Sequence, residues 1–195
     1  MKGIAALTGK MDRRERILLA VSGLLVLVAC LIPIWQINLL SPQYPEGLHL
    51  VIRAQHITGN VQSVNILNHY IGMKPISDAA FPEFGWMRPA LLTVGGLLLL
   101  IPLLGRRELA NLGRLLLFSF DGYMMWDLYR WLYDWGHNLD RRAPITVPPF
   151  TPPLLGVRQI ANFHVLSIPS WGGSSVMLAT LLGGYSLWHA MRHSS

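Results

Sequence analysis

Residues 89–105 read PALLTVGGLLLLIPLLG, an apolar run without a charged side chain. A helix needs about 20 apolar residues to cross roughly 30 Å of hydrocarbon, so this run is a little short but suitable in composition. Three further apolar segments occur along the chain, at 17–35, 115–135 and 172–188. Their lengths predict four transmembrane helices and an all-α membrane fold.

The composition of the whole chain also favours a membrane environment. Of its 195 residues, 52% are hydrophobic and 13% are charged, and the mean hydropathy is +0.38; soluble domains are less apolar. The net charge of +6 would suit nucleic acid, but Lys and Arg are scattered around the apolar runs and form no single stripe. We therefore expect no nucleic-acid partner.

The positions of Lys and Arg predict an orientation. Basic residues precede the first apolar segment and fill the short connection 106–114, and such residues collect on the cytoplasmic side of a membrane. Both terminal segments, 1–16 and 189–195, are then cytoplasmic, whereas 36–88 and 136–171 are extracytoplasmic. The expected location is the bacterial cytoplasmic (inner) membrane, crossed several times.

The single cysteine, Cys30, leaves one alternative open. It excludes an internal disulfide and every multi-cysteine metal motif. Together with Leu27, Val28 and Ala29, it resembles a lipoprotein processing site, which would make Cys30 a lipidated N-terminus. The following residues, LIPIW, continue the apolar run where a processed lipoprotein turns polar. An intact anchor helix is therefore favoured over lipidation.

The two long segments between the apolar runs predict a small extracytoplasmic cap containing a short strand and helix. Apolar and polar residues alternate from Leu48 to Ile57, which is typical of a strand. From Val61 the apolar residues recur at helical spacing, with Asn60 as an N-cap and Gly72 as a stop. The proline-rich segment 136–171 predicts an irregular loop held by its contacts.

The stretch NILNHYIGMKPI (65–76) contains His69 and Met73, four residues apart. On a helix they share one face, and imidazole with thioether suits reduced copper. His56 and His164 lie on the same predicted side and supply further ligands. The alternative stays open that His69 bonds a backbone carbonyl and that Met73 fills a gap in packing.

Four charged residues fall within the segment 115–135, where charge is costly. Asp127, Arg130 and Asp134 lie on one helix face, where a guanidinium can neutralise two carboxylates. Asp121 lies roughly 20 Å along the axis from Trp135 and thus near the middle of the membrane. It is either part of an ion or metal path or a carboxyl held by Ser119, Thr93, Ser174 or Ser175.

The segment 172–188 carries a stripe of small residues. Ser175, Ala179 and Gly183 recur at steps of four and so lie on one helix face. Such a stripe lets the backbone of another helix approach closely. We expect it to serve helix packing.

Three stretches carry a family resemblance: YPEGL (44–48), NILNHYIGMKPI (65–76) and PPFTPPLLGVRQIANF (148–163). They resemble small multi-pass membrane proteins of bacterial gene clusters for nitrous oxide reductase, a periplasmic copper enzyme. The resemblance implies copper handling or electron supply at the outer face of the cytoplasmic membrane. It transfers no role to an individual residue, although His69 and Met73 lie within it.

The sequence therefore predicts an accessory membrane protein that assists copper handling or assembly of a periplasmic copper redox enzyme. Its partners would be membrane lipid and a membrane or periplasmic protein. The alternative is a non-catalytic structural subunit of a larger membrane redox complex. Signatures of hydrolases, P-loop proteins and zinc proteases are missing from the sequence. An accessory role is therefore favoured over an enzyme.

Overall fold

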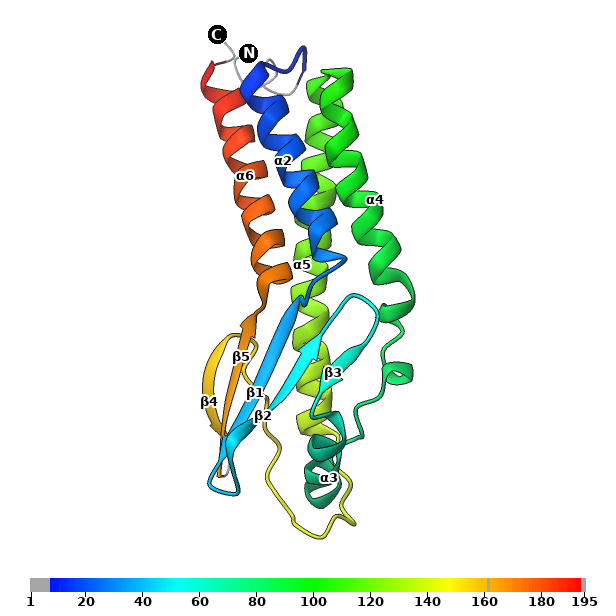
Figure 1. Cartoon of the computed structure of the whole chain (residues 1–195), viewed down its shortest axis with the longest axis vertical. Coiled ribbons are helices and arrows are strands. Elements are labelled where there is room, and N and C mark those ends of the chain that lie inside the picture. Colours follow the sequence, from blue (N-terminus) through cyan, green and yellow to red (C-terminus); the bar gives the residue numbers. More distant parts are fainter. Residues whose placement is uncertain (1–7, 161, 194–195) are drawn as a thin grey trace. The chain divides into compact units, whose positions relative to one another are not determined.

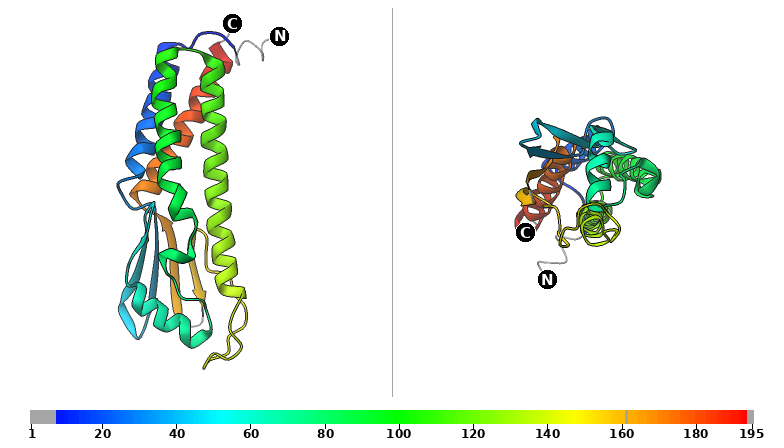
Figure 2. Two further views of the ribbon diagram at one scale, coloured as in Figure 1. Left: turned by 90° about the vertical axis from the view of Figure 1, so that its right-hand side faces the viewer. Right: turned by 90° about the horizontal axis from the view of Figure 1, so that it is seen from below.

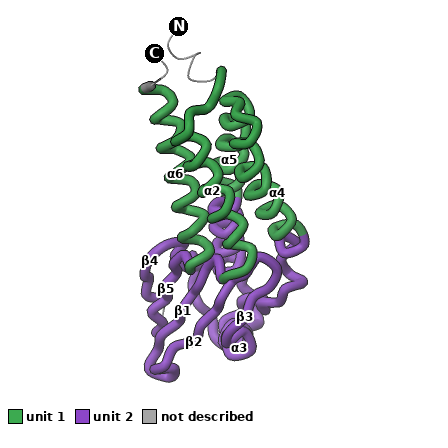
Figure 3. Tube along the Cα trace, turned by 45° about the horizontal axis from the view of Figure 1, so that its top comes forward, with its two compact units in different colours: residues 1–32, 86–123, 171–195 green, residues 33–85, 124–170 purple. Residues whose placement is uncertain are grey.

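The computed structural model describes residues 8–160 and 162–193, which form two compact units (Figure 3). Unit 1 comprises the described residues of Met1–Ile32, Trp86–Tyr123 and Trp171–Ser195. Unit 2 comprises those of Pro33–Gly85 and Met124–Ser170. The outer parts of the predicted cytoplasmic termini, 1–7 and 194–195, lie outside the described residues.

The prediction of an all-α protein with four transmembrane helices is wrong. The described chain is mixed α/β, because five α-helices accompany a five-stranded antiparallel sheet. Within the described ranges, only helix α4 (Glu83–Leu104) has the length and composition to cross a membrane. The other apolar segments are shortened or carry charges, and part of the apolar sequence forms strands instead.

Unit 1 is built from four helices or parts of them, each of which contains part of one apolar segment. Besides α4 these are α2 (Arg13–Ala29), α5 (Arg107–His137) and α6 (Trp171–His193). Helix α2 starts with a reciprocal cap. Asp12 Oδ1 accepts a hydrogen bond from Glu15 N at 2.8 Å, and Glu15 Oε2 accepts one from Asp12 N at 2.9 Å.

Small residues allow α2 and α6 to pack side by side (Figure 1). Ser22 Oγ lies 3.0 Å from the carbonyl oxygen of Ala179, and Ser175 Oγ lies 3.1 Å from that of Leu25. Such contacts between a hydroxyl and a neighbouring backbone require closely spaced helices. The predicted packing role of Ser175 and Ala179 is confirmed.

Unit 2 contains the sheet. Its strands are β1 (Trp35–Ser41), β2 (Tyr44–Ile52), β3 (Ile57–Gly59), β4 (Gly156–Ile160) and β5 (Phe163–Pro169). They are ordered β3-β2-β1-β5-β4, and each pairs antiparallel with its neighbours (Figure 1). The central strand, β1, belongs to the hairpin β1-β2 and also pairs with β5 of the later hairpin β4-β5.

The short helix predicted from Val61 is confirmed as α3 (Val61–Ile71), which Figure 2 shows beside the sheet. It ends at Gly72, whose left-handed φ of 78° favours glycine. Asn60 precedes the helix, but its side chain accepts a hydrogen bond from His49 N at 2.9 Å instead of capping. Helix and sheet enclose a core centred on Leu48, Leu50 and Val64.

The loop between α5 and β4 contacts side chains of the sheet. Ser167 Oγ donates to the carbonyl oxygen of Leu154 at 3.0 Å and accepts from Trp35 Nε1 at 2.8 Å. A single-turn helix, η1 (Asp78–Ala80), precedes α4. The expected irregular loop over 136–171 is found for 138–155, and the remainder forms the end of α5 and the strands β4 and β5.

Candidate functional site

The two faces of the sheet differ in what covers them. Side chains on one face are packed against α3 and the 138–155 loop, and this covered face holds the buried strand residues Trp35, Leu48, Leu50, Val165 and Ser167. Side chains on the other face, here called the open face, are exposed or half-buried. According to the strand registers, the side chains of the open face are Gln36, Asn38, Leu40, His49, Val51, Thr58, Val157, Gln159, His164, Leu166 and Ile168.

The open face holds no Asp, Glu, Lys or Arg side chain. Its apolar members include Leu40, which is 42% exposed, and Val157, which is 66% exposed. The polar members are amides, a hydroxyl and imidazoles, such as His49, whose Nδ1 lies 2.9 Å from Asn38 Oδ1. A surface depleted of charge that mixes apolar and neutral polar groups is typical of the core of a protein interface.

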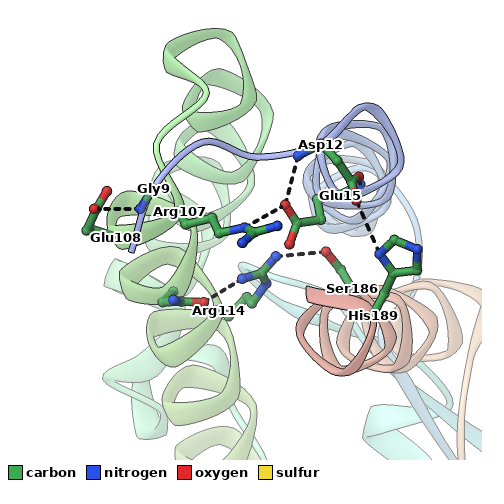
Figure 4. Close-up of polar contacts among 9 residues, drawn as sticks. Gly9, Asp12, Glu15, Arg107, Glu108, Arg114, Ser186 and His189 are labelled. Atoms are coloured by element: carbon green, nitrogen blue, oxygen red, sulfur yellow. Dashed lines mark hydrogen bonds and ion pairs between the residues drawn. The ribbon is translucent and has the colours of Figure 1, made fainter. Parts of the chain in front are cut away.

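A second cluster of polar side chains lies inside unit 1 (Figure 4). We call it the charge network: Asp12, Glu15, Arg107, Arg114 and His189. Arg107 Nε donates to Glu15 Oε2 at 3.1 Å, and Glu15 is fully buried. Arg114 is 1% exposed and donates to Ser186 Oγ of α6 at 2.8 Å. Asp12 Oδ2 lies 3.4 Å from His189 Nδ1.

The charge network connects α2, α5 and α6. Two carboxylates face two guanidinium groups, so the formal charges balance without His189. Glu15 Oε1 and Arg114 Nε are buried and have no hydrogen-bond partner in the described part of the chain. The network thus links the three helices, and removing one partner would leave a buried charge uncompensated. Only the pattern Asp12-x-x-Glu15, a capping box, signals it in the sequence.

Asp121 is held across two helices. Thr180 of α6 donates a hydrogen bond to Asp121 Oδ2, while Asp121 Oδ1 is buried and unpaired among the residues described. Of the four partners expected from sequence, Thr93 Oγ1 donates to the carbonyl oxygen of Pro89 at 2.8 Å. Asp121 is thus a carboxyl bonded to a neighbouring helix, but its partner is Thr180, five residues after the expected Ser175.

The predicted ladder Asp127–Arg130–Asp134 forms in part. Arg130 Nη2 contacts Asp127 Oδ1 at 2.6 Å, and the second carboxylate that it reaches, at 3.0 Å, belongs to Glu83 of α4. Asp134 instead accepts from Lys74 Nζ at 2.9 Å. That hydrogen bond, with another from Asn138, holds the pKa of Asp134 below its ordinary value.

The candidate copper ligands lie at separate places in unit 2. His69 is exposed in the last turn of α3, and Met73 follows the left-handed Gly72. Met73 N donates to the carbonyl oxygen of Asn68 at 2.8 Å, so a reversed turn replaces the helical geometry expected for this pair.

The two other histidines lie at opposite ends of the sheet. His56 follows the end of β2, where Ile52 pairs with Trp35, whereas His164 pairs with Leu40. Five residues along β1 correspond to roughly 17 Å. In the described ranges, no three or more His, Cys, Asp or Glu side chains are grouped to hold a metal ion. Copper binding at His69 and Met73 stays a prediction.

No protein-family model, curated protein or solved structure matches this chain significantly.

Proposed function

We propose that this protein is a membrane-embedded accessory subunit: unit 1 is held in lipid, and unit 2 presents its open face to a partner protein. One observation supports the proposal that unit 1 lies in lipid. Every helix of unit 1 exposes large apolar side chains: Ile17, Val21 and Leu24 on α2; Leu100, Leu103 and Leu104 on α4; Leu112 and Leu115 on α5; Met177, Leu181 and Met191 on α6.

The interior of unit 1 is polar by comparison. Glu15, Ser22, Arg114 and Ser186 are all buried there. Proteins in water rarely expose large continuous apolar surfaces, and polar residues in lipid-embedded bundles face the interior. An arrangement with apolar residues outside and charges inside is what a lipid environment favours.

Aromatic residues near both ends of the unit 1 helices support this proposal. The rings of Trp86 and Tyr123 lie 5.7 Å apart, and those of Tyr185 and Trp188 lie 5.5 Å apart. Tryptophan and tyrosine favour membrane interfaces, so these ring pairs suit a unit that contacts lipid.

The proposed location is the bacterial cytoplasmic membrane, with α4 as the spanning helix. Residues near both chain ends meet at one end of unit 1, since Arg107 N donates to the carbonyl oxygen of Gly9 at 2.9 Å and Asp12 contacts His189. That end is basic, which supports a cytoplasmic orientation.

Unit 2 would then meet its partner in water. The charge-free open face and the edge strand β4 supply a flat surface of the kind found in interface cores. This arrangement favours a structural subunit of a membrane complex, with a membrane or periplasmic protein as partner.

A more specific form of the proposal is that this subunit takes part in copper handling through His69 and Met73. A purified chain that takes up no Cu(I), or that keeps full uptake with His69→Ala and Met73→Ala, would remove it.

Photo-cross-linking in native membranes tests the proposal. A photoreactive amino acid replaces Gln159 on the open face or, as a control, the exposed Arg141 in the 138–155 loop. We expect the chain to resist alkaline extraction from membranes and to form one discrete adduct from Gln159 alone. A chain released by alkali would contradict the lipid assignment, and equal labelling from both positions would contradict the role of the open face.

A further inference from the structure

Unit 1 has a strongly basic end. Lys10 forms an isolated backbone bridge with Arg106, and Met11 N donates to the carbonyl oxygen of Gly105 at 2.9 Å, so the chain before α2 is fixed beside the start of α5. Exposed basic side chains gather here on α2 and α6 and in the segments that precede α2 and α5. They are Lys10, Arg13, Arg14, Arg16, Arg106 and Arg192, called the basic end below.

We propose that the basic end binds the headgroups of anionic phospholipids, an inference that rests on the proposed embedding of unit 1 in lipid. The acidic residues of this region are already engaged within the protein. Asp12 caps α2, Glu15 is buried against Arg107, and Glu108 accepts from Gly9 N at 3.0 Å. Across the residues that the structure describes, the basic end forms no ion pair with a carboxylate.

The placement of these charges on the helices is unfavourable without an anion. Arg13, Arg14 and Arg16 occupy the first turn of α2, and Arg106 directly precedes α5. A helix N-terminus carries positive partial charge from its unpaired N–H groups, so cations there repel it. An anionic ligand offsets this repulsion and the mutual repulsion of the side chains, whereas water and salt only screen them.

Apolar side chains beside the basic end identify the anion as a lipid. Ile17, which is 52% exposed, directly follows Arg16. Leu104, which is 65% exposed, comes two residues before Arg106. Arg192 lies over the Trp188 ring at 4.2 Å from its centroid, which pairs a cation with an interfacial aromatic. A free phosphate or a nucleic acid would use the basic groups alone, whereas a phospholipid engages both the charge and the apolar border.

Lipid retention by the full-length protein tests this inference. The chain is reconstituted into vesicles of phosphatidylcholine with a minor fraction of phosphatidylglycerol, extracted in mild detergent, and its retained lipids are quantified by mass spectrometry. We expect phosphatidylglycerol to be enriched over its share in the vesicle. Because a basic residue near an anionic surface contributes about a factor of five, Arg13→Gln with Arg14→Gln lowers the enrichment more than about tenfold.

Matched variants keep this test specific. Arg141→Gln with Arg142→Gln removes the same charge from exposed positions of unit 2 and leaves the enrichment unchanged. Arg106→Gln with Arg192→Gln reproduces the loss without changing α2, in case the first variant fails to fold. About 1 M salt also removes the enrichment, because it shortens the screening length to about 3 Å.

Three results would overturn the inference. They are no enrichment in the unmodified chain, equal enrichment in all variants, and loss of enrichment when inorganic phosphate is added at constant ionic strength, which would indicate a small-anion site. A chain that inserts equally well into vesicles with or without phosphatidylglycerol and shows no enrichment removes this inference alone. A chain that enters neither kind of vesicle contradicts the proposed function itself.

Discussion

Glu15 is the residue on which the charge network of unit 1 depends most. It is fully buried, and its carboxylate pairs with Arg107 at 3.1 Å. Glu15→Ala leaves Arg107 and the buried Arg114 without their countercharge. Breaking a buried pair in this way typically costs about 3–5 kcal/mol. Denaturant unfolding of the detergent-solubilised chain measures the loss.

Substitution of Glu108, at the start of α5, provides a control for the Glu15→Ala variant. Glu108 accepts from Gly9 N at the exposed start of α5. Glu108→Ala removes the same charge near the same end of unit 1, and we expect it to leave the unfolding midpoint nearly unchanged. If both variants lower the midpoint equally, the network contributes no more than a surface charge does.

The lowered pKa of Asp134 makes the stability of unit 2 depend on pH in acid. Lys74 Nζ donates to its carboxylate at 2.9 Å and lowers its pKa in the folded state. A carboxylate with a lowered folded pKa stabilises the fold above the unfolded value of about 3.9, and this contribution is lost as pH falls through the folded pKa. Asp134→Asn therefore gives a flatter stability curve below pH of about 4.

A substitution of the partner, Lys74, provides a control for this prediction. Lys74→Met removes the main cause of the shift, so it flattens most of the curve, and Asp134→Asn adds only the smaller effect of the hydrogen bond from Asn138. Urea unfolding followed at a series of pH values measures the curves. Parallel curves for the unmodified chain and Asp134→Asn down to the lowest pH would show that the pair does not stabilise the fold.

Residue pairs within one helix could be predicted from sequence, and pairs between elements could not. Spacing along α5 correctly joined Asp127 to Arg130. The other partners, Glu83, Thr180 and Lys74, lie on different elements, and no local pattern indicates which residues folding will bring together. The charge network was missed for the same reason.

At the scale of elements, the crossing of α2 and α4 depends on Gly23. A Cβ at this position would lie 2.6 Å from Leu99 N and 2.7 Å from the carbonyl oxygen of Gly95, both backbone atoms that cannot move aside. Gly23→Ala therefore separates the two helices. We expect it to cost about 1–3 kcal/mol, the usual range for overpacking, in spite of the better helix propensity of alanine.

Gly96 supplies the matched substitution on α4. A Cβ there meets no atom within 4 Å, so Gly96→Ala gains helix propensity without a clash. We expect this variant to be stabilised by up to about 1 kcal/mol. Thermal unfolding in one detergent compares the two, and a Gly23→Ala variant as stable as Gly96→Ala would show that the backbones are not in close contact.

Some elements follow from local sequence and others do not. Helix α3 could be predicted because its period and its Gly72 stop are local features. Strands β1, β4 and β5 were missed, since β1 and β5 pair across more than a hundred residues and four prolines closely precede β4. Sheet formation there is stabilised by non-local pairing, which alternation within one segment does not indicate.

At the scale of the whole molecule, composition indicated an apolar environment but not the architecture. Hydropathy correctly located α4 as a candidate span. It also counted apolar residues of the other segments as spans, although some of these belong to strands and others to helices that carry Glu15, Arg114 or Asp127. Hydropathy averages a segment, whereas burial assigns each side chain of a helix to the interior or the exterior.

Spin-label accessibility on α4 tests most directly whether the outer surface of unit 1 contacts lipid. In a Cys30→Ser background, labels are placed at Leu100, which is 58% exposed, at Leu98, which is 0% exposed, and at Gln159 of unit 2. In vesicles we predict that the Leu100 label collides often with oxygen and rarely with a water-soluble nickel chelate, the Leu98 label with neither, and the Gln159 label with the chelate. If the Leu100 label meets the chelate as often as the Gln159 label does, the surface faces water and the account is contradicted.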